Sequence, residues 1–229
     1  MFAPLKAILF DMDGLMIDSE RLARDAWLDT GRELSLPLTF EFFCSLTGLA
    51  VAGCQQRLND SLGDPVLAAA ALDRWRSRYR ERIHDGGIPL KPGIIDILEW
   101  VKRQGLPCAV ASSTQRSLLD SKLAQAGLAG YFAATVAGDE VACTKPAPDI
   151  YLAAAAALDV APSECVALED SPIGMRAALA AGIAVIQVPD LLEADEALAA
   201  QALAICPSLT DAINILNACM EQGKNLQTE

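Results

Sequence analysis

Two aspartates stand one residue apart at the end of the chain's first apolar run. The stretch KAILFDMDGL is apolar from Ala7 to Phe10 and then reaches Asp11, Asp13 and Gly14. Carboxylates this close repel each other, and they lose solvation beside a buried strand. A turn, a solvated cap or a bound cation would each make the pair tolerable.

Polar side chains also follow later apolar runs, at the points where strands of a parallel sheet would end. Ligands of open parallel sheets bind outside the carboxyl ends of the strands, so we expect these side chains to converge on one edge. In chain order they are Ser112, Ser113, Thr114, Lys145, Glu169 and Asp170.

These residue types suit phosphoryl transfer assisted by Mg²⁺. Asp11 and Asp170 offer the hard oxygen ligands that Mg²⁺ prefers, and the cation would relieve the repulsion at the first strand end. Lys145 and the Ser112 hydroxyl could hold the remaining phosphate oxygens. Asp11 is then the nucleophile that forms an aspartyl phosphate, and Asp13 protonates the leaving alkoxide and later accepts a proton from water.

Each candidate also has a purely structural interpretation. The two early aspartates could form a turn ahead of Gly14, and residues 112–114 could cap a helix that begins near Arg116. Lys145 could be a surface charge, and the acidic pair at 169–170 could begin a helix. Asp149 could cap the following helix. Convergence of several strand ends favours the functional interpretation over these.

Short apolar strands alternate with helical stretches, which predicts an α/β fold with a Rossmann-like, doubly wound parallel sheet. Glycines 127 and 182 stand where helix C-caps are expected. The predicted strands are Ala7–Phe10, Cys108–Ala111, Ala133–Ala137, Cys165–Leu168 and Ala184–Val188. The predicted helices are Gly93–Gln104, Ser117–Ala126, Asp149–Leu158 and Ile173–Ala181.

Residues 18–87 break this alternation, because they hold amphipathic helix and no good apolar strand. They predict an inserted α-helical cap domain, which leaves residues 1–17 and 88–229 as the catalytic core. Arginines crowd the segment Arg74–Arg82, but acidic residues are interspersed and Trp75, Tyr79 and Ile83 recur at helical spacing. A solvated helix face explains that segment better than a nucleic-acid site does.

Four motifs in order, FDMDGLMIDSE, VASST, TKPAPDIY and ALEDSPIGMRAA, resemble those of the haloacid dehalogenase-like superfamily. The resemblance is nearest to its sugar-phosphate phosphatases and β-phosphoglucomutases with a helical cap. It implies a magnesium-dependent phosphatase that hydrolyses a small phosphorylated metabolite, such as a sugar phosphate, through an aspartyl phosphate. The dehalogenases lack the second aspartate, so Asp13 points away from dehalogenation.

The resemblance also implies roles for individual residues. Asp11 would be the nucleophile, Asp13 the acid/base, and both would bind the metal, Asp13 through its backbone carbonyl. The implied phosphate-binding residues are Ser112, Ser113 and Lys145, and the further metal ligands are Glu169 and Asp170.

The chain departs from the mutase pattern in the cap. Ala23 aligns with the mutase histidine, and no arginine follows Gly48, where the sequence reads LAVAG. These differences favour hydrolysis over a phosphomutase, and the filled motif positions argue against a catalytically silent binding protein of the same fold. The cap loop would line the substrate with Leu49, Val51, Cys54 and Gln55.

Composition narrows the partners. There are 18 Lys and Arg against 30 Asp and Glu, for a formal charge of -12, which argues against nucleic acid as a partner. Seven cysteines without a CxxC pair are typical of small core residues in a reducing compartment. With no signal peptide and no apolar run of membrane-spanning length, we expect a cytoplasmic protein, either a monomer or a weak homodimer.

Overall fold

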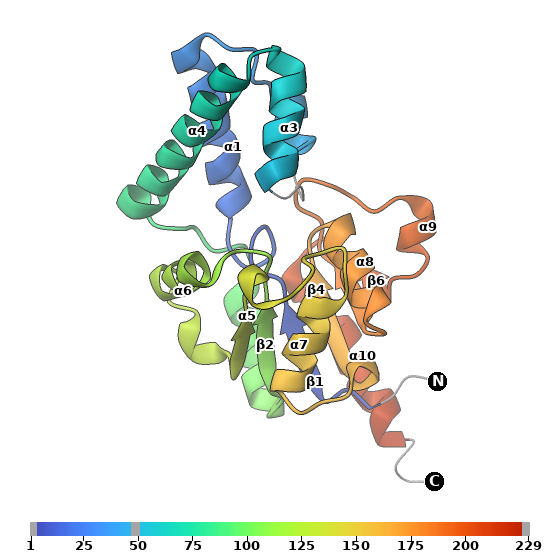
Figure 1. The fold of residues 1–229 in the computed structure, drawn as a ribbon. Helices are drawn as coiled ribbons and strands as arrows, with labels where there is room; N and C mark the ends of the chain where they lie inside the picture. The colour runs from blue at the N-terminus through green and yellow to red at the C-terminus, as the bar shows by residue number, and fades with distance from the viewer. Residues whose placement is uncertain (1–3, 47–50, 226–229) are drawn as a thin grey trace. The chain divides into compact units, whose positions relative to one another are not determined.

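The computed structural model describes residues 4–46 and 51–225, with side chains described for residues 4–46 and 53–221 (Figure 1). The chain divides into two compact units, one of Met1–Ile17 with Pro89–Glu229 and the other of Asp18–Ile88. Of the four residues expected to line the cap loop, Leu49 and the side chain of Val51 lie outside the described part. The LAVAG segment after Gly48 falls largely outside it as well.

The first unit is built on one six-stranded parallel sheet with the order β3-β2-β1-β4-β5-β6. Four of the strands are fully or largely buried apolar runs, as a sheet covered on both faces requires. The predicted α/β class is thereby confirmed. The strands are β1 (Ala7–Phe10), β2 (Cys108–Ala111), β3 (Ala134–Val136), β4 (Cys165–Glu169), β5 (Ala184–Gln187) and β6 (Ala204–Ile205).

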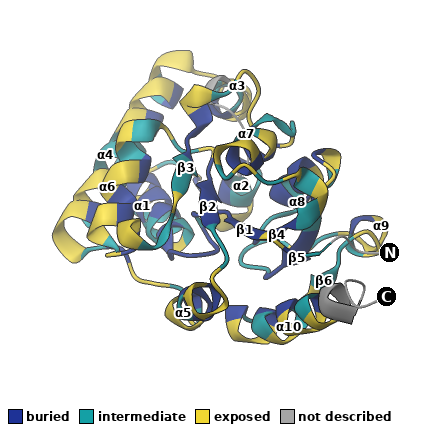
Figure 2. Ribbon diagram, turned by 90° about the horizontal axis from the view of Figure 1, so that it is seen from below, coloured by how far each residue is buried: buried dark blue, intermediate teal, exposed yellow. Residues whose placement is uncertain are grey.

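Helices cover both faces of this sheet, with α7 and α8 on one face and α5 and α10 on the other (Figure 2). Gly127 and Gly182 have φ of +69° and +74° just beyond α6 and α8, as predicted for helix ends. The helices are α5 (Ile94–Gln104), α6 (Arg116–Gln125), α7 (Asp149–Ala157), α8 (Pro172–Ala180), α9 (Glu196–Ala199) and α10 (Leu209–Asn225). Single 3₁₀ turns are η1 (Ala129–Tyr131), η2 (Gly138–Glu140) and η3 (Pro162–Glu164).

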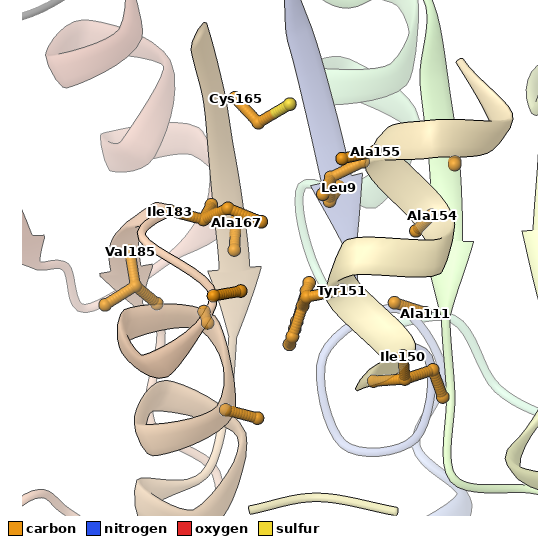
Figure 3. Packing of buried hydrophobic residues seen from close by; sticks show 14 of the residues in the cluster. Leu9, Ala111, Ile150, Tyr151, Ala154, Ala155, Cys165, Ala167, Ile183 and Val185 are labelled. Carbon is orange, nitrogen blue, oxygen red and sulfur yellow. The ribbon is translucent and has the colours of Figure 1, made fainter. Parts of the chain in front are cut away.

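The core on the α7–α8 face takes every second residue of each strand. Leu9, Ala111 and Ala167 point to this face, where they meet small side chains of α7 such as Ala154 (Figure 3). This alternation follows from the pleat of a β-strand. Small residues let α7 lie close to the strands, and Tyr151 is the large, fully buried side chain among them.

The second unit is helical, in agreement with the predicted insertion. Its helices are α1 (Ser19–Leu34), α2 (Phe40–Cys44), α3 (Val51–Leu62) and α4 (Pro65–Gly86). Trp27 is fully buried and stacks on Phe42 with ring centroids 5.9 Å apart, while Trp75 meets it edge-on at 5.6 Å. The Trp75 indole also donates a 2.8 Å hydrogen bond to the backbone carbonyl of Ala23, which is itself buried.

The arginines of α4 face carboxylates of α1. Arg74 and Arg78 both pair with Glu33, and Arg82 pairs with Asp29. This arrangement confirms that the arginine-rich segment is the charged face of an amphipathic helix. It gives α1 and α4 a ladder of ion pairs beside their apolar contact.

The cysteines and the apolar character of the helices complete the description of the fold. Five of the seven cysteines, Cys54, Cys108, Cys165, Cys206 and Cys219, are buried, and all seven are free thiols. Among the described residues, no helix combines the length and apolar character needed to cross a membrane.

Candidate active site

The register of the sheet brings the ends of β1, β2 and β4 side by side. Phe10 pairs with Val110 on β2 and with Leu168 on β4. Asp11 follows directly, and its backbone N–H donates a 3.0 Å hydrogen bond to the carbonyl of Leu168. Residues that follow these three strands therefore share one edge of the sheet.

Lys145 joins two of the predicted carboxylates. Its Nζ donates to Asp11 Oδ1 at 2.5 Å and to Glu169 Oε1 at 2.6 Å. Tyr151 from α7 donates its hydroxyl proton to the same Glu169 oxygen at 2.5 Å. The Lys145 ammonium also lies 4.9 Å from the centre of the Tyr151 ring, a distance typical of a cation–π contact.

Burial and charge shift the acidity of this group. Burial is the main reason that the pKa of Asp11 rises to about 7, and Glu169 and Asp13 add to the rise while the Lys145 ammonium opposes it. Burial would lower the pKa of Lys145, but the carboxylates of Asp11 and Glu169 outweigh it and raise that pKa above its usual value. Lys145 therefore stays a cation, and Asp11 needs a further cation besides Lys145 to be fully ionised near neutral pH.

Glu169 is fully buried at the end of β4 and packs against the first turn of α8. Gly174 makes that approach possible, because a Cβ on it would lie 2.0 Å from the Glu169 carboxylate. Ser171 caps α8 by accepting from the Gly174 N–H at 3.2 Å. The acidic pair thus stands directly before a helix start, as the structural alternative predicted, and this position leaves both carboxylates at the edge of the sheet.

Asp170 lies against the turn that follows β1. Gly14 has a φ of +83°, and a Cβ there would stand 2.2 Å from Asp170 Oδ2 and 3.4 Å from Asp190 Oδ2. Buried Gln187 holds the backbone carbonyl of Asp170 with a 3.1 Å hydrogen bond. Asp190 accepts from Lys91 at 2.6 Å through Oδ1.

Asp13 is held on both of its carboxylate oxygens. Oδ1 accepts a 2.5 Å hydrogen bond from Lys122 of α6, and Oδ2 accepts a 2.7 Å hydrogen bond from the Thr114 hydroxyl. Lys122 is only 3% exposed, which is rare for a lysine and requires a partner such as this one.

The hydroxyl-bearing loop after β2 is folded back on itself. Ser112 is buried and its Oγ accepts from the Thr114 N–H at 3.2 Å, whereas Ser113 is exposed. Gly138 of η2 packs on this loop, since a Cβ there would lie 2.2 Å from the Ser113 carbonyl oxygen. The helix α6 begins at Arg116, and the residue before it makes no side-chain cap, so capping by residues 112–114 is wrong.

The expected cap at Asp149 is also wrong. Asp149 is the first residue of α7, and Pro148 stands at the N-cap position. The carboxylate instead lies in the first helical turn, where negative charge is favourable.

The carboxylates fit a divalent cation. Asp11, Glu169 and Asp170 each offer an oxygen within 4.8 Å of the others, and all three are buried. Among the described residues, Asp190 Oδ2 is a buried oxygen without a hydrogen-bond partner, and it lies on the Asp170 side of Gly14. Three buried carboxylates so close together require neutralisation beyond Lys145, and hard oxygen donors are the set that Mg²⁺ takes.

Four side chains of this site were not singled out from the sequence: Lys122, Tyr151, Gln187 and Asp190. Lys122 had a usable signal, because it falls between Leu119 and Leu123 on the apolar side of α6, where a lysine is unexpected. Tyr151 lies six residues after Lys145, in the motif TKPAPDIY. The contacts of Gln187 and Asp190 depend on loop conformation, which composition does not encode.

Comparison with known proteins agrees with this geometry. Residues 8–188 match the family described as haloacid dehalogenase-like hydrolase. The fructose-1-phosphate phosphatase YqaB of Escherichia coli is 32% identical over 82% of this chain and 98% of its own length. A phosphatase of phosphorylated carbohydrates from Thermotoga maritima is 32% identical over 78% of this chain and 82% of its own length.

Solved structures give the same result in three dimensions. CbbY from Rhodobacter sphaeroides in complex with phosphate has a TM-score of 0.71 and 32% identity, covering 90% of this chain and 95% of its own. A mutant of that protein was solved with xylulose-(1,5)bisphosphate, with 31% identity and the same TM-score and coverage. The strand-end carboxylates, the buried lysine and these matches together show that the chain belongs to the haloacid dehalogenase-like hydrolase family, in the branch of CbbY, the β-phosphoglucomutases and the sugar-phosphate phosphatases.

Proposed function

We propose that this protein is a magnesium-dependent phosphatase that hydrolyses a small phosphorylated metabolite, a sugar phosphate, through a phosphorylated Asp11. The observation that carries the proposal is the buried cluster in which Lys145 bridges Asp11 and Glu169, with Asp170 alongside. Relatives that act on fructose 1-phosphate and phosphorylated carbohydrates supply the substrate class.

The residue roles follow from this cluster. A carboxylate oxygen of Asp11 attacks phosphorus, and the bond from phosphorus to the sugar oxygen breaks while Asp13 gives that oxygen a proton. Asp13 then accepts a proton from the water that attacks the aspartyl phosphate, which releases inorganic phosphate and restores Asp11. Lys145, Ser112 and Ser113 hold the oxygens of the transferred group.

A Mg²⁺ ion held by Asp11, Asp170, Glu169 and the backbone carbonyl of Asp13 would neutralise phosphate charge and keep Asp11 ionised. Charge balance supports the ion. When ionised, Asp11, Asp13, Glu169 and Asp170 carry four negative charges, and the bonded Lys145 and Lys122 carry two positive ones, so a divalent cation would balance the charge.

We also propose that residues 1–17 and 88–229 form the catalytic core and that residues 18–87 serve as the cap that closes over the substrate. Closure of such a unit would exclude water from the site. Ala23 is buried and engaged through its carbonyl by Trp75, and it carries no titratable group. Hydrolysis is therefore favoured over a mutase mechanism that would use a histidine there.

A panel of phosphorylated metabolites tests the function. Purified protein is assayed for released phosphate with Mg²⁺ and with excess chelator, in parallel with Asp11→Asn. We expect Mg²⁺-dependent release from one or more sugar phosphates and none from the variant. Sugar isomerisation without phosphate release would support the mutase, and inactivity on every compound, p-nitrophenyl phosphate included, would support a silent binding protein.

A further inference from the structure

Lys122 is a buried cation with no role in the chemistry described above. It lies in α6 on the side that also buries Leu119 and Leu123. Burying an ammonium is costly unless it is paired, and a leucine or methionine would pack in the same place without that cost. The chain nevertheless keeps a lysine there, and its Nζ donates to Asp13 Oδ1 at 2.5 Å.

A second donor reaches the other oxygen of the same carboxylate. Thr114 Oγ1 donates to Asp13 Oδ2 at 2.7 Å, from the loop that leads into α6. Two donors on the two oxygens fix both the rotamer and the plane of a carboxylate, whereas one donor leaves it free to rotate. Asp13 is thus oriented by residues 101 and 109 positions away in sequence.

The backbone around Asp13 is held as well. Residues 13 and 17 form a β-bridge, and the Gly14 N–H donates to the Ile17 carbonyl at 3.0 Å. Because this turn fixes the main chain, the side-chain torsions of Asp13 are the ones that can still vary. Lys122 and Thr114 act on those torsions.

We propose that Lys122 and Thr114 form a clamp that positions Asp13 for proton transfer to the leaving group and from the attacking water. The proposal rests on the proposed function, in which Asp13 is the acid/base. Lys122 is a positioning residue and does not touch the substrate. Its effect on kcat/KM should appear only when the leaving group needs a proton. This parameter reports the steps up to departure of that group, whereas the later proton transfer from water is the same for every substrate.

Leaving-group dependence tests the clamp. p-Nitrophenolate leaves readily without a proton, whereas a sugar alkoxide requires one. In Lys122→Met we expect kcat/KM for the best sugar phosphate of the panel to fall by about 100-fold, within the usual range for general acid catalysis. We expect kcat/KM for p-nitrophenyl phosphate to fall by no more than about fivefold, as the nucleophile and phosphate site are intact.

Three further variants make the result interpretable. Thr114→Val keeps the side-chain shape and should shift the ratio of the two kcat/KM values in the same direction. Lys122→Arg should recover part of the loss on the sugar phosphate. Lys102→Met, at an exposed position of α5, should leave the ratio unchanged.

Equal losses on both substrates in Lys122→Met and Thr114→Val would show a merely structural role and overturn the proposal, as would no loss in either. Circular dichroism and thermal melting establish that the variants fold, and if Lys122→Met does not, the Thr114→Val ratio decides. Activity of Asp11→Asn on p-nitrophenyl phosphate would overturn the proposed function itself, which is a separate outcome from a failed clamp.

Discussion

Asp11 combines burial with three neighbouring charges, and this combination sets how the site responds to pH. Burial raises its pKa to about 7, against the opposing effect of Lys145. A carboxylate must lose its proton before it can ligate a metal, so a proton and Mg²⁺ compete for this side chain. Mg²⁺ binding should therefore weaken as the pH falls through 7.

This competition gives a prediction for Mg²⁺ affinity measured by isothermal titration calorimetry. Below pH 7 Asp11 is increasingly protonated, so we expect the affinity to fall by about tenfold for each pH unit. Above pH 7 the affinity should be nearly constant. Asp11→Asn is the control and should bind weakly with no such slope, and equal wild-type affinities at pH 6 and 8 would contradict the prediction.

Gly174 gives a second prediction at the residue scale. A Cβ there meets the Glu169 carboxylate at 2.0 Å, and this carboxylate is fixed by Lys145 and Tyr151. We expect Gly174→Ala to displace Glu169, to lower the free energy of unfolding by about 1–3 kcal/mol and to reduce kcat by about tenfold or more. Chemical denaturation and phosphate release measure the two effects.

Gly130 provides the matched control. A Cβ there meets nothing within 4 Å, and its φ is not positive. Gly130→Ala should leave both stability and kcat near their wild-type values. Wild-type activity in Gly174→Ala would mean that the position of the Glu169 carboxylate does not matter for turnover.

At the scale of elements, Arg116 ties together three segments that support the hydroxyl loop. Its guanidinium contacts Glu140 of η2, Asp120 of α6 and the Thr135 carbonyl of β3, the last at 2.7 Å. Its own N–H donates to Asp139 at 2.8 Å. Arg116 begins α6, so the segment 112–114 is held from its C-terminal side by this network.

The network predicts a binding defect when it is removed. Arg116→Met should lower the free energy of unfolding by about 1–2 kcal/mol, a modest value because the ion pairs are partly exposed. KM for the phosphorylated substrate should rise more than kcat falls, since the proposed function gives this loop the role of binding phosphate. Arg103→Met, at an exposed position of α5, is the control. A fall in kcat with KM unchanged would argue against this role of the loop.

Elements of the sheet were the easiest to predict. β1, β2 and β4 are buried on both faces, so their sequences are continuous apolar runs with polar residues directly after them. β6 has two residues and no distinctive sequence pattern. It forms a strand only because the tertiary fold places it beside β5. A run of two residues is too short for its amino-acid composition to distinguish a strand from a loop.

At the scale of the molecule, the predicted site residues differ from the missed ones in whether a local sequence pattern marks them. Asp11, Lys145 and Asp170 belong to motifs with fixed spacing, and their positions follow from strand ends. Lys122 and Asp13 meet across 109 residues, and Tyr151 reaches Glu169 across 18. Such pairs depend on how α6 and α7 pack against the sheet, which no local pattern records.

The central claim is that Asp11 becomes phosphorylated during turnover. Wild-type protein is mixed with p-nitrophenyl phosphate and Mg²⁺, quenched in acid, and treated with borohydride, which reduces an aspartyl phosphate to homoserine. Mass spectrometry of the peptide that contains residue 11 should then find homoserine at that position in the turning-over enzyme and aspartate in the substrate-free control. Homoserine at another aspartate would contradict the mechanism. So would unmodified Asp11 in an enzyme that releases a burst of p-nitrophenolate before the steady state and is quenched during turnover.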